Sequence, residues 1–199
     1  AAPLVTLFKD PATRKTFTNK ALEMAKYLYP EHIWPQVEKL ITKAPRVAAH
    51  TEIMPKTLEG GAEGLTHWNK SLSTIGGARF PVEMDIAAAK SAGSPDVLAH
   101  EMTHVAQRLG NKDVPELYSL TRRGLEKHPD LPSLWTQYAT YLGNPFERSA
   151  RDVSLRKVRG VQTPARSAIK GLEELATKDP ENEFLKQAMD IVLKRRVSK

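Results

Sequence analysis

The 199-residue chain contains no cysteine. Disulfide bonds, zinc sites built on thiolates and a cysteine nucleophile are therefore excluded, and any bound metal must be held by His, Asp or Glu. The lack of cysteine assigns no cellular compartment, because nothing else in the sequence requires an oxidising or a reducing environment.

Long apolar runs are also missing. No run approaches the roughly 18 residues that a membrane-spanning helix needs, so we expect a soluble protein without a membrane span. The first ten residues, AAPLVTLFKD, contain neither the basic region nor the long apolar region of a signal peptide. We therefore expect no signal peptide in this chain, and its localisation stays open.

The composition is that of an ordinary globular protein. Apolar residues make up 40% of the chain and charged residues 27%, and a chain of this length can bury a core. The length predicts a single domain over residues 1–199. Within it we expect N-terminal helices over 1–47, strands and turns over 48–94, the helices that carry the site over 95–160, and a basic helical hairpin over 161–199.

Positive charges outnumber negative charges, with a net charge of +7. From Arg148 to the end, 13 Lys and Arg residues face 7 Asp and Glu residues, so most of the excess is C-terminal. This excess forms either a solvated basic face or a surface for an acidic partner. The basic residues are mixed with acids and no RNA- or DNA-binding motif accompanies them, so nucleic acid is not the expected partner.

Hydrophobic periodicity predicts a predominantly helical α+β fold. Helices are expected at residues 11–29, 35–43, 95–109, 114–127, 131–142, 145–158, 164–177 and 181–196. Between Ala48 and Ser94 glycines separate short apolar runs, which is typical of strands and turns and predicts a small antiparallel sheet.

The clearest predicted strand covers residues 78–86, ARFPVEMDI. Phe80, Val82 and Met84 alternate with polar residues, as in a strand that buries one face. Pro81 has no N–H to donate to a neighbouring strand, which predicts a position at the edge of the sheet. An uncovered edge can accept an extended peptide as an added strand, so we expect substrate along 79–86.

The predicted helix at 95–109 follows this strand and carries two histidines. His100 and His104 lie four residues apart on one helical face, so both imidazoles can reach one ion. Glu101 beside them can accept a proton from a water that the ion acidifies. This HExxH pattern is typical of zinc hydrolases, and the alternative is an amphipathic helix with two surface histidines. Start and stop signals flank the helix at Ser94, Pro95, Gly110 and Asn111.

A catalytic zinc usually has three protein ligands, so a third ligand must lie elsewhere. The metzincin class is excluded, because it requires Gly and a third His where this chain has Gln107 and Gly110. Glu147 lies in the first turn of the helix expected at 145–158, where it could bind the metal or cap its own helix. These features leave both alternatives open. The downstream candidates are Asp113, Glu116, Glu126, His128, Asp130 and Glu147, with His128 second to Glu147.

The segments HEMTHVAQ at 100–107 and YLGNPFERSARD at 141–152 resemble the paired motifs of zincin metallopeptidases. They are most similar to the HExxHxxQ domains of phage and mobile-element polyvalent proteins and of bacterial effector peptidases. In those domains the glutamate of an ExxAR-type motif completes the site, as in gluzincins. The resemblance implies a zincin-like fold and one Zn²⁺ ion held by His100, His104 and Glu147, with Glu101 as catalytic base.

Several other residues have two interpretations. Gln107 could hydrogen-bond to the metal ligands. Arg151 could stabilise an oxyanion or orient Glu147, or it could form an ion pair on the helix surface. Tyr141 could donate to the transition state or pack in the core. His67, beside Trp68, could line the cleft or be half-buried packing.

Motif and resemblance together predict a zinc metallopeptidase that hydrolyses a protein or peptide substrate. The alternative is a non-enzymatic binding module on a zincin scaffold, such as a virion or secretion-particle component, whose basic C-terminal helices hold an acidic partner. Glu101 favours the enzyme, because a structural zinc site has no use for a base.

Overall fold

A computed structural model describes residues 47, 50–68, 72–74, 77–89, 94–126, 140–154 and 164–197. The chain divides into two compact units, Ala1–Val105 and Ala106–Lys199, and the boundary falls inside helix α5 (Ser94–Gly110). The single domain expected from the length stays a prediction. The helices predicted at 11–29 and 35–43, and most of the one at 131–142, lie outside the described residues.

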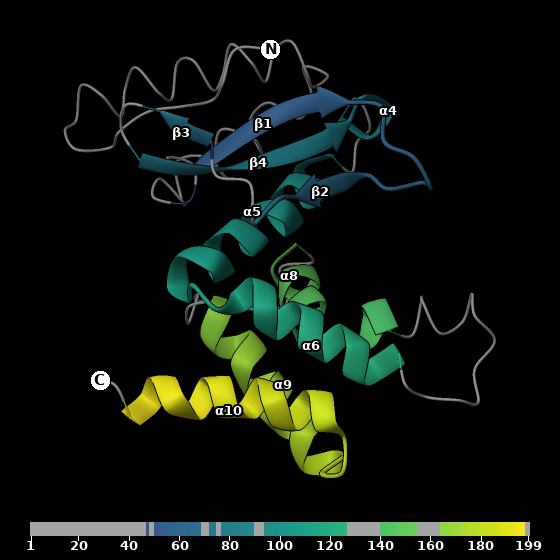
Figure 1. Cartoon of the computed structure of the whole chain (residues 1–199). Helices are drawn as coiled ribbons and strands as arrows, with labels where there is room; N and C mark the ends of the chain where they lie inside the picture. Colours follow the sequence, from purple (N-terminus) through teal and green to yellow (C-terminus); the bar gives the residue numbers. More distant parts are fainter. Residues whose placement is uncertain are drawn as a thin grey trace. The chain divides into compact units, whose positions relative to one another are not determined.

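The first unit contains a small sheet built around one central strand, β4 (Figure 1). β1 pairs with β4 in parallel, whereas β2 and β3 pair with it in antiparallel fashion. The antiparallel pairs agree with the prediction, and the parallel pair makes the sheet mixed. The strands are β1 (Thr51–Lys56), β2 (Gly64–Thr66), β3 (Leu72–Thr74) and β4 (Gly77–Asp85).

The strand predicted at 78–86 is β4, and its predicted position at the edge of the sheet is wrong. β1 and β2 flank Val82–Met84 on both sides, so an extended peptide cannot add to β4 there. Pro81 is tolerated because Phe80 donates its N–H toward the β1 side, to the His50 carbonyl, and neighbouring residues alternate. Pro81 is the next residue, so its missing N–H faces away from β1. Pro81 also lies between Arg79, where the pairing of β4 with β3 ends, and Val82, where its pairing with β2 begins.

The central position of β4 explains the burial of both its faces. Phe80, Val82 and Met84 are buried, as the alternation predicts, but Pro81 and Glu83 on the opposite face are buried too. A strand with neighbours on both sides and both faces covered cannot be recognised from one-sided alternation.

Two glycines form the turn that leads from β1 to β2. Gly60 and Gly61 have φ angles of 70° and 74°. Only glycine adopts this left-handed region without strain, so the glycine pair permits the chain to reverse here. The turn places β2 on the side of β4 opposite β1, and Thr66 of β2 contacts α5 there.

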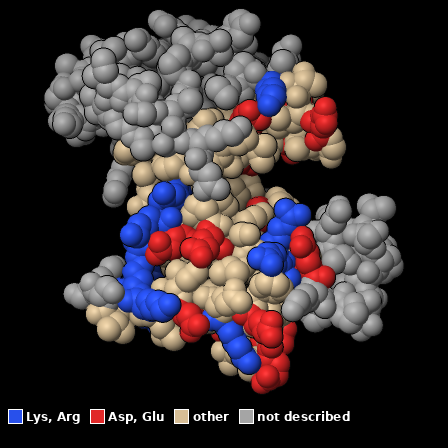
Figure 2. Space-filling view, viewed as in Figure 1, with Lys and Arg blue, Asp and Glu red and all other residues tan. Residues whose placement is uncertain are grey.

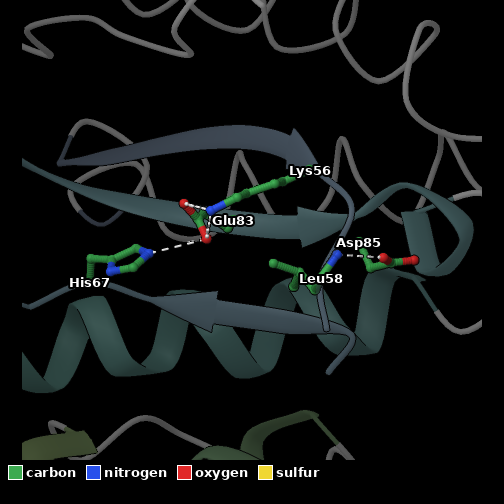
Figure 3. A network of polar contacts seen from close by, with 5 residues as sticks. All are labelled: Lys56, Leu58, His67, Glu83 and Asp85. Atoms are coloured by element: carbon green, nitrogen blue, oxygen red, sulfur yellow. Dashed lines mark hydrogen bonds and ion pairs between the residues drawn. The ribbon is translucent and has the colours of Figure 1, made fainter. Parts of the chain in front are cut away.

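The end of β4 leads into a short helix, α4 (Ile86–Ala89). The Asp85 carboxylate accepts hydrogen bonds from the N–H groups of Ala87 (2.8 Å), Ala88 (3.2 Å) and Leu58 (3.0 Å). The hydrogen bonds from Leu58 and Ala88 are the main reason that the pKa of Asp85 lies below its usual value. One carboxylate thus caps α4, and its bond to Leu58 fixes the loop after β1 (Figure 3).

Helix α5 extends the predicted 95–109 by one residue at each end. Leu98, Met102 and Val105 lie three and four residues apart and are buried, so they form an apolar stripe along the helix. At its end Asn111 donates its N–H to the Gln107 carbonyl, and a Cβ on Gly110 would lie only 3.0 Å from Cβ of Ala165. Glycine therefore ends this helix where another helix approaches closely.

The second unit is helical in its described residues. α6 packs against α10, and α9 packs against both α8 and α10. The predicted helices at 114–127, 164–177 and 181–196 are confirmed within two residues at each end, and the one at 145–158 is described as far as Ser154. The helices are α6 (Val114–Glu126), α8 (Pro145–Ser154), α9 (Pro164–Lys178) and α10 (Glu183–Val197).

Two of the three basic residues in the last turn of α10 form ion pairs with acids. Arg195 forms an ion pair with Asp113 at 2.6 Å, and Arg196 forms one with Glu173. Figure 2 shows Lys and Arg lying among Asp and Glu on the face in view. The charge excess of this region is thus interspersed with acids. None of the helices that the structure describes has the length and apolar character to cross a membrane.

Candidate metal centre

The two histidines of α5 direct the same ring atom toward one point. Nε2 of His100 and Nε2 of His104 lie 3.2 Å apart, and the rings are nearly perpendicular, at 84°. Two nitrogens bound tetrahedrally to one zinc ion, each about 2.0–2.1 Å from it, would be separated by about 3.4 Å. The observed spacing therefore fits two ligands of one ion with little rearrangement.

Glu101 is buried, at 7% exposure, and β2 holds its side chain. The Thr66 hydroxyl lies 2.5 Å from Oε2 of Glu101 and 3.1 Å from the Glu101 carbonyl. A Cβ on Gly64 would lie 2.7 Å from Cγ of Glu101, so the carboxylate occupies the space that a side chain at position 64 would fill. A hydroxyl and a glycine on one strand thus fix the position of the predicted base.

Trp68 follows β2 and contacts the second histidine. Its indole Nε1 donates to the carbonyl of His104 at 3.0 Å, and the two rings meet edge to face at 5.3 Å. His67 and Trp68 are both half-buried, and the indole supports the backbone and the ring of a predicted ligand. The segment from Gly64 to Trp68 therefore braces both Glu101 and His104.

His67, in the same segment, contacts a different group. Its Nε2 lies 3.3 Å from Oε2 of Glu83, and Lys56 Nζ lies 3.1 and 3.2 Å from the two oxygens of that carboxylate (Figure 3). Burial raises the pKa of Glu83, but hydrogen bonds from Lys56 and His67 and the charges of both outweigh burial and lower it. Glu83 is thus ionised near neutral pH and links β1, β4 and the end of β2.

The start of α8 is fixed through both peptide groups of Phe146. The Phe146 N–H donates to Oδ1 of Asn144 at 3.0 Å, and Gln107 Nε2 donates to the Phe146 carbonyl at 2.9 Å. Gln107 and Phe146 are fully buried. Gln107 comes from the last turns of α5, one helical turn after His104. Gln107 therefore bonds to the backbone of the residue before Glu147, and a hydrogen bond from Gln107 to a metal ligand stays a prediction.

The contacts of Glu147 bear on the capping alternative. In a capping box its carboxylate would accept the N–H of Asn144, but that N–H donates to the Thr140 carbonyl at 3.0 Å. Oε1 of Glu147 instead accepts the hydroxyl of Tyr118, on α6, at 2.8 Å. Burial and the Glu147 charge raise the pKa of Tyr118, so the phenol stays protonated and donates. Asn144 caps α8 with its own side chain.

Glu147 is 5% exposed, and its carboxylate belongs to the same group of donors as the two histidines. His100, His104 and Glu147 can each offer one ligand atom, and these atoms lie within 4.8 Å of one another. Two imidazole nitrogens and one carboxylate oxygen form a His₂Glu set, which suits a zinc ion with an open fourth position. The donor chemistry therefore fits the predicted metal.

The other candidate ligands have different surroundings. Asp113 pairs with Arg195, Glu126 accepts a 2.7 Å hydrogen bond from Arg122, and Glu116 is exposed. The two remaining candidates, His128 and Asp130, lie outside the described residues.

Arg151 and Tyr141 contact each other. The guanidinium lies over the Tyr141 ring, 5.2 Å from its centre, and donates to the carbonyls of Tyr141 (3.5 Å) and Leu142 (2.6 Å). These bonds tie α8 to the helical residues before it. A role of either residue at the transition state stays a prediction.

Sequence reasoning missed three residues of the centre: Gly64, Thr66 and Tyr118. Tyr118 borders a cavity of about 190 Å³ lined by residues of α6 and the segment before α8, including Arg122 and Tyr141. Thr66 and Tyr118 reach carboxylates 35 and 29 residues away in the chain, and no local pattern signals such contacts.

No protein-family model, no curated protein and no solved structure matches the chain. The interpretation of the centre accordingly depends on the contacts and distances of its own residues.

Proposed function

We propose that the protein is a zinc-dependent peptidase in which His100, His104 and Glu147 hold one Zn²⁺ ion and Glu101 is the base. The observation that carries the proposal is the 3.2 Å separation of the two Nε2 atoms, with a carboxylate oxygen of Glu147 in the same group of donors. Side chains four residues apart lie on one face of a helix, and imidazole nitrogens this close can share one ligand or one proton.

The base is supported by its own contacts. Glu101 follows the first histidine and is buried, and Thr66 donates to one of its carboxylate oxygens. A general base must be held within hydrogen-bond reach of the proton that it accepts, and the Thr66 bond fixes one oxygen of this carboxylate. A zinc site with only a structural role would gain nothing from a buried, positioned carboxylate beside its ligands.

The chemistry follows from these placements. When bound, the zinc ion supplies a Lewis acid that polarises the scissile carbonyl and lowers the pKa of a water to about 7. Glu101 accepts the proton of the attacking water and delivers it to the amine that leaves. Thr66 holds the Glu101 carboxylate during both transfers, while Gln107 and Asn144 keep the start of α8 in place.

Replacing the base separates catalysis from metal binding. We expect Glu101→Gln to retain zinc and to lose hydrolysis of an unstructured protein by about 100-fold or more, because a general base contributes about 10²–10⁴ in rate. The matched control is Glu116→Gln, at an exposed position, which should leave the rate unchanged. Cleavage products are followed by mass spectrometry on zinc-loaded protein, and zinc is measured in the same samples. Equal rates for wild type and Glu101→Gln would rule out the proposed mechanism.

The non-enzymatic alternative rests on the basic C-terminal helices. Arg195 and Arg196 are both engaged by acids of the same unit, so part of the charge that an acidic partner would need is already neutralised. This pairing favours the peptidase.

A further inference from the structure

The Tyr118 hydroxyl on Oε1 of Glu147 is the contact that the proposed mechanism leaves unused. Glu147 comes from the first turn of α8, whereas Tyr118 comes from the middle of α6. A glutamate side chain has three rotatable bonds, and a hydrogen-bond partner on a second element restricts where its carboxylate lies. Tyr118 provides this second point of attachment.

Tyr118 is itself held in place by its neighbours. Its ring meets the ring of Phe146 at 6.1 Å and 62°, an edge-to-face contact, and Phe146 is fully buried. Leu117 and Thr121, on the same helix, are also fully buried. The buried Phe146 ring therefore supports the Tyr118 ring on one side and helps to hold the phenol next to Glu147.

The backbone beside Glu147 is fixed as firmly. Asn144 accepts the N–H of Phe146, and Gln107 donates to its carbonyl, at 3.0 and 2.9 Å. With the Tyr118 bond at 2.8 Å, the carboxylate of Glu147 and the backbone of the residue before it have defined partners from three different parts of the second unit. Such support gains metal affinity by removing the conformational freedom that binding would otherwise have to remove.

We propose that Tyr118 is a positioning residue that orients the carboxylate of Glu147 toward the metal, and that it thereby sets the zinc affinity of the centre. The proposal rests on the proposed zinc site and adds a residue to it. Tyr118 acts through Glu147 and need not touch substrate. Groups that support metal ligands in this way typically contribute 10- to 100-fold to metal affinity.

The test measures zinc affinity of the full chain by competition with a chromogenic chelator. Tyr118→Phe keeps the ring and removes only the hydroxyl, and it should weaken zinc binding by about 10- to 100-fold. The matched control is Thr121→Val, which removes a buried hydroxyl one turn away whose partner is the Leu117 carbonyl of its own helix. This control should bind zinc as tightly as wild type. Melting temperatures of the metal-free variants, measured alongside, show whether either substitution unfolds the chain.

A double substitution tests whether Tyr118 acts through Glu147. In the Glu147→Gln background, Tyr118→Phe should change zinc affinity by less than about twofold, because the ligand that it orients is already altered. An equal loss in both backgrounds, or wild-type affinity in Tyr118→Phe, would overturn the inference while leaving the zinc site intact. Wild-type protein that binds no zinc would instead overturn the proposed function itself.

Discussion

The position of the Glu101 carboxylate depends on two small residues of β2. Thr66 donates to Oε2, and the lack of a side chain at Gly64 leaves room for Cγ and Oε1. A base must lie within hydrogen-bond reach of the proton that it accepts, and small displacements from that position cost rate. We therefore propose that β2 aligns Glu101, the proposed base, with the proposed metal ligands.

Substitution of Thr66 tests this alignment. Thr66→Val keeps the shape of the side chain and removes the donor, so we expect zinc content to be unchanged and kcat to fall by about tenfold or more, since hydrogen bonds to charged groups contribute about 1.5–3 kcal/mol. Thr66→Ser retains the hydroxyl and should recover most of the rate. Peptide hydrolysis and zinc content are measured on the same preparations. Wild-type kcat in Thr66→Val would show that the hydroxyl does not position the base.

At the scale of elements, the helices were predicted far better than the sheet. The bounds of α5, α6, α9 and α10 lie within two residues of those expected, because each has an apolar stripe and clear end signals. The central position of β4 was missed, since its neighbour β1 carries Pro55 and no clear alternation. Strand pairing depends on residues far apart in the chain, which local periodicity does not report.

The residues of the candidate metal centre divide in the same way, into those that local sequence predicts and those that only the fold brings together. His100, Glu101 and His104 form one local motif and were predicted from their spacing alone. Glu147 needed a resemblance in addition, because its local pattern also fits a cap. The contacts of Thr66, Trp68 and Tyr118 come from the fold and have no counterpart in local sequence.

The packing of α9 against α8 gives a prediction at this scale. A Cβ on Gly171 would lie 2.9 Å from Cβ of Pro145, closer than packed carbons approach. We expect Gly171→Ala to destabilise the protein by about 1–3 kcal/mol, because overpacking outweighs the gain in helix propensity. Urea unfolding measures the difference.

Gly143 provides the matched control for this substitution. It is also helical, but its Cβ would meet Leu125 at an ordinary 3.8 Å. Gly143→Ala should leave stability unchanged or raise it by up to about 1 kcal/mol, as expected for alanine in a helix. A similar stabilisation of Gly171→Ala would show that α8 and α9 do not approach so closely.

For the whole molecule, metal binding and folding are expected to be coupled. The proposed ligands come from α5 and α8, and Gln107 of α5 is bonded to the start of α8. A ligand that binds only the folded chain stabilises it by mass action, so zinc should raise the melting temperature. The net charge of +7 acts in the opposite direction through self-repulsion, although ion pairs such as Arg195–Asp113 offset part of it.

The most direct test of the zinc site is the metal content of the protein purified without added zinc. The account predicts one equivalent of zinc in the wild type and a large loss in His100→Ala and in Glu147→Gln, with Glu116→Gln as the control that retains the metal. Elemental analysis by inductively coupled plasma mass spectrometry gives these values on dialysed samples. Less than half an equivalent in the wild type, with no change in His100→Ala, would contradict the proposal that this centre binds zinc.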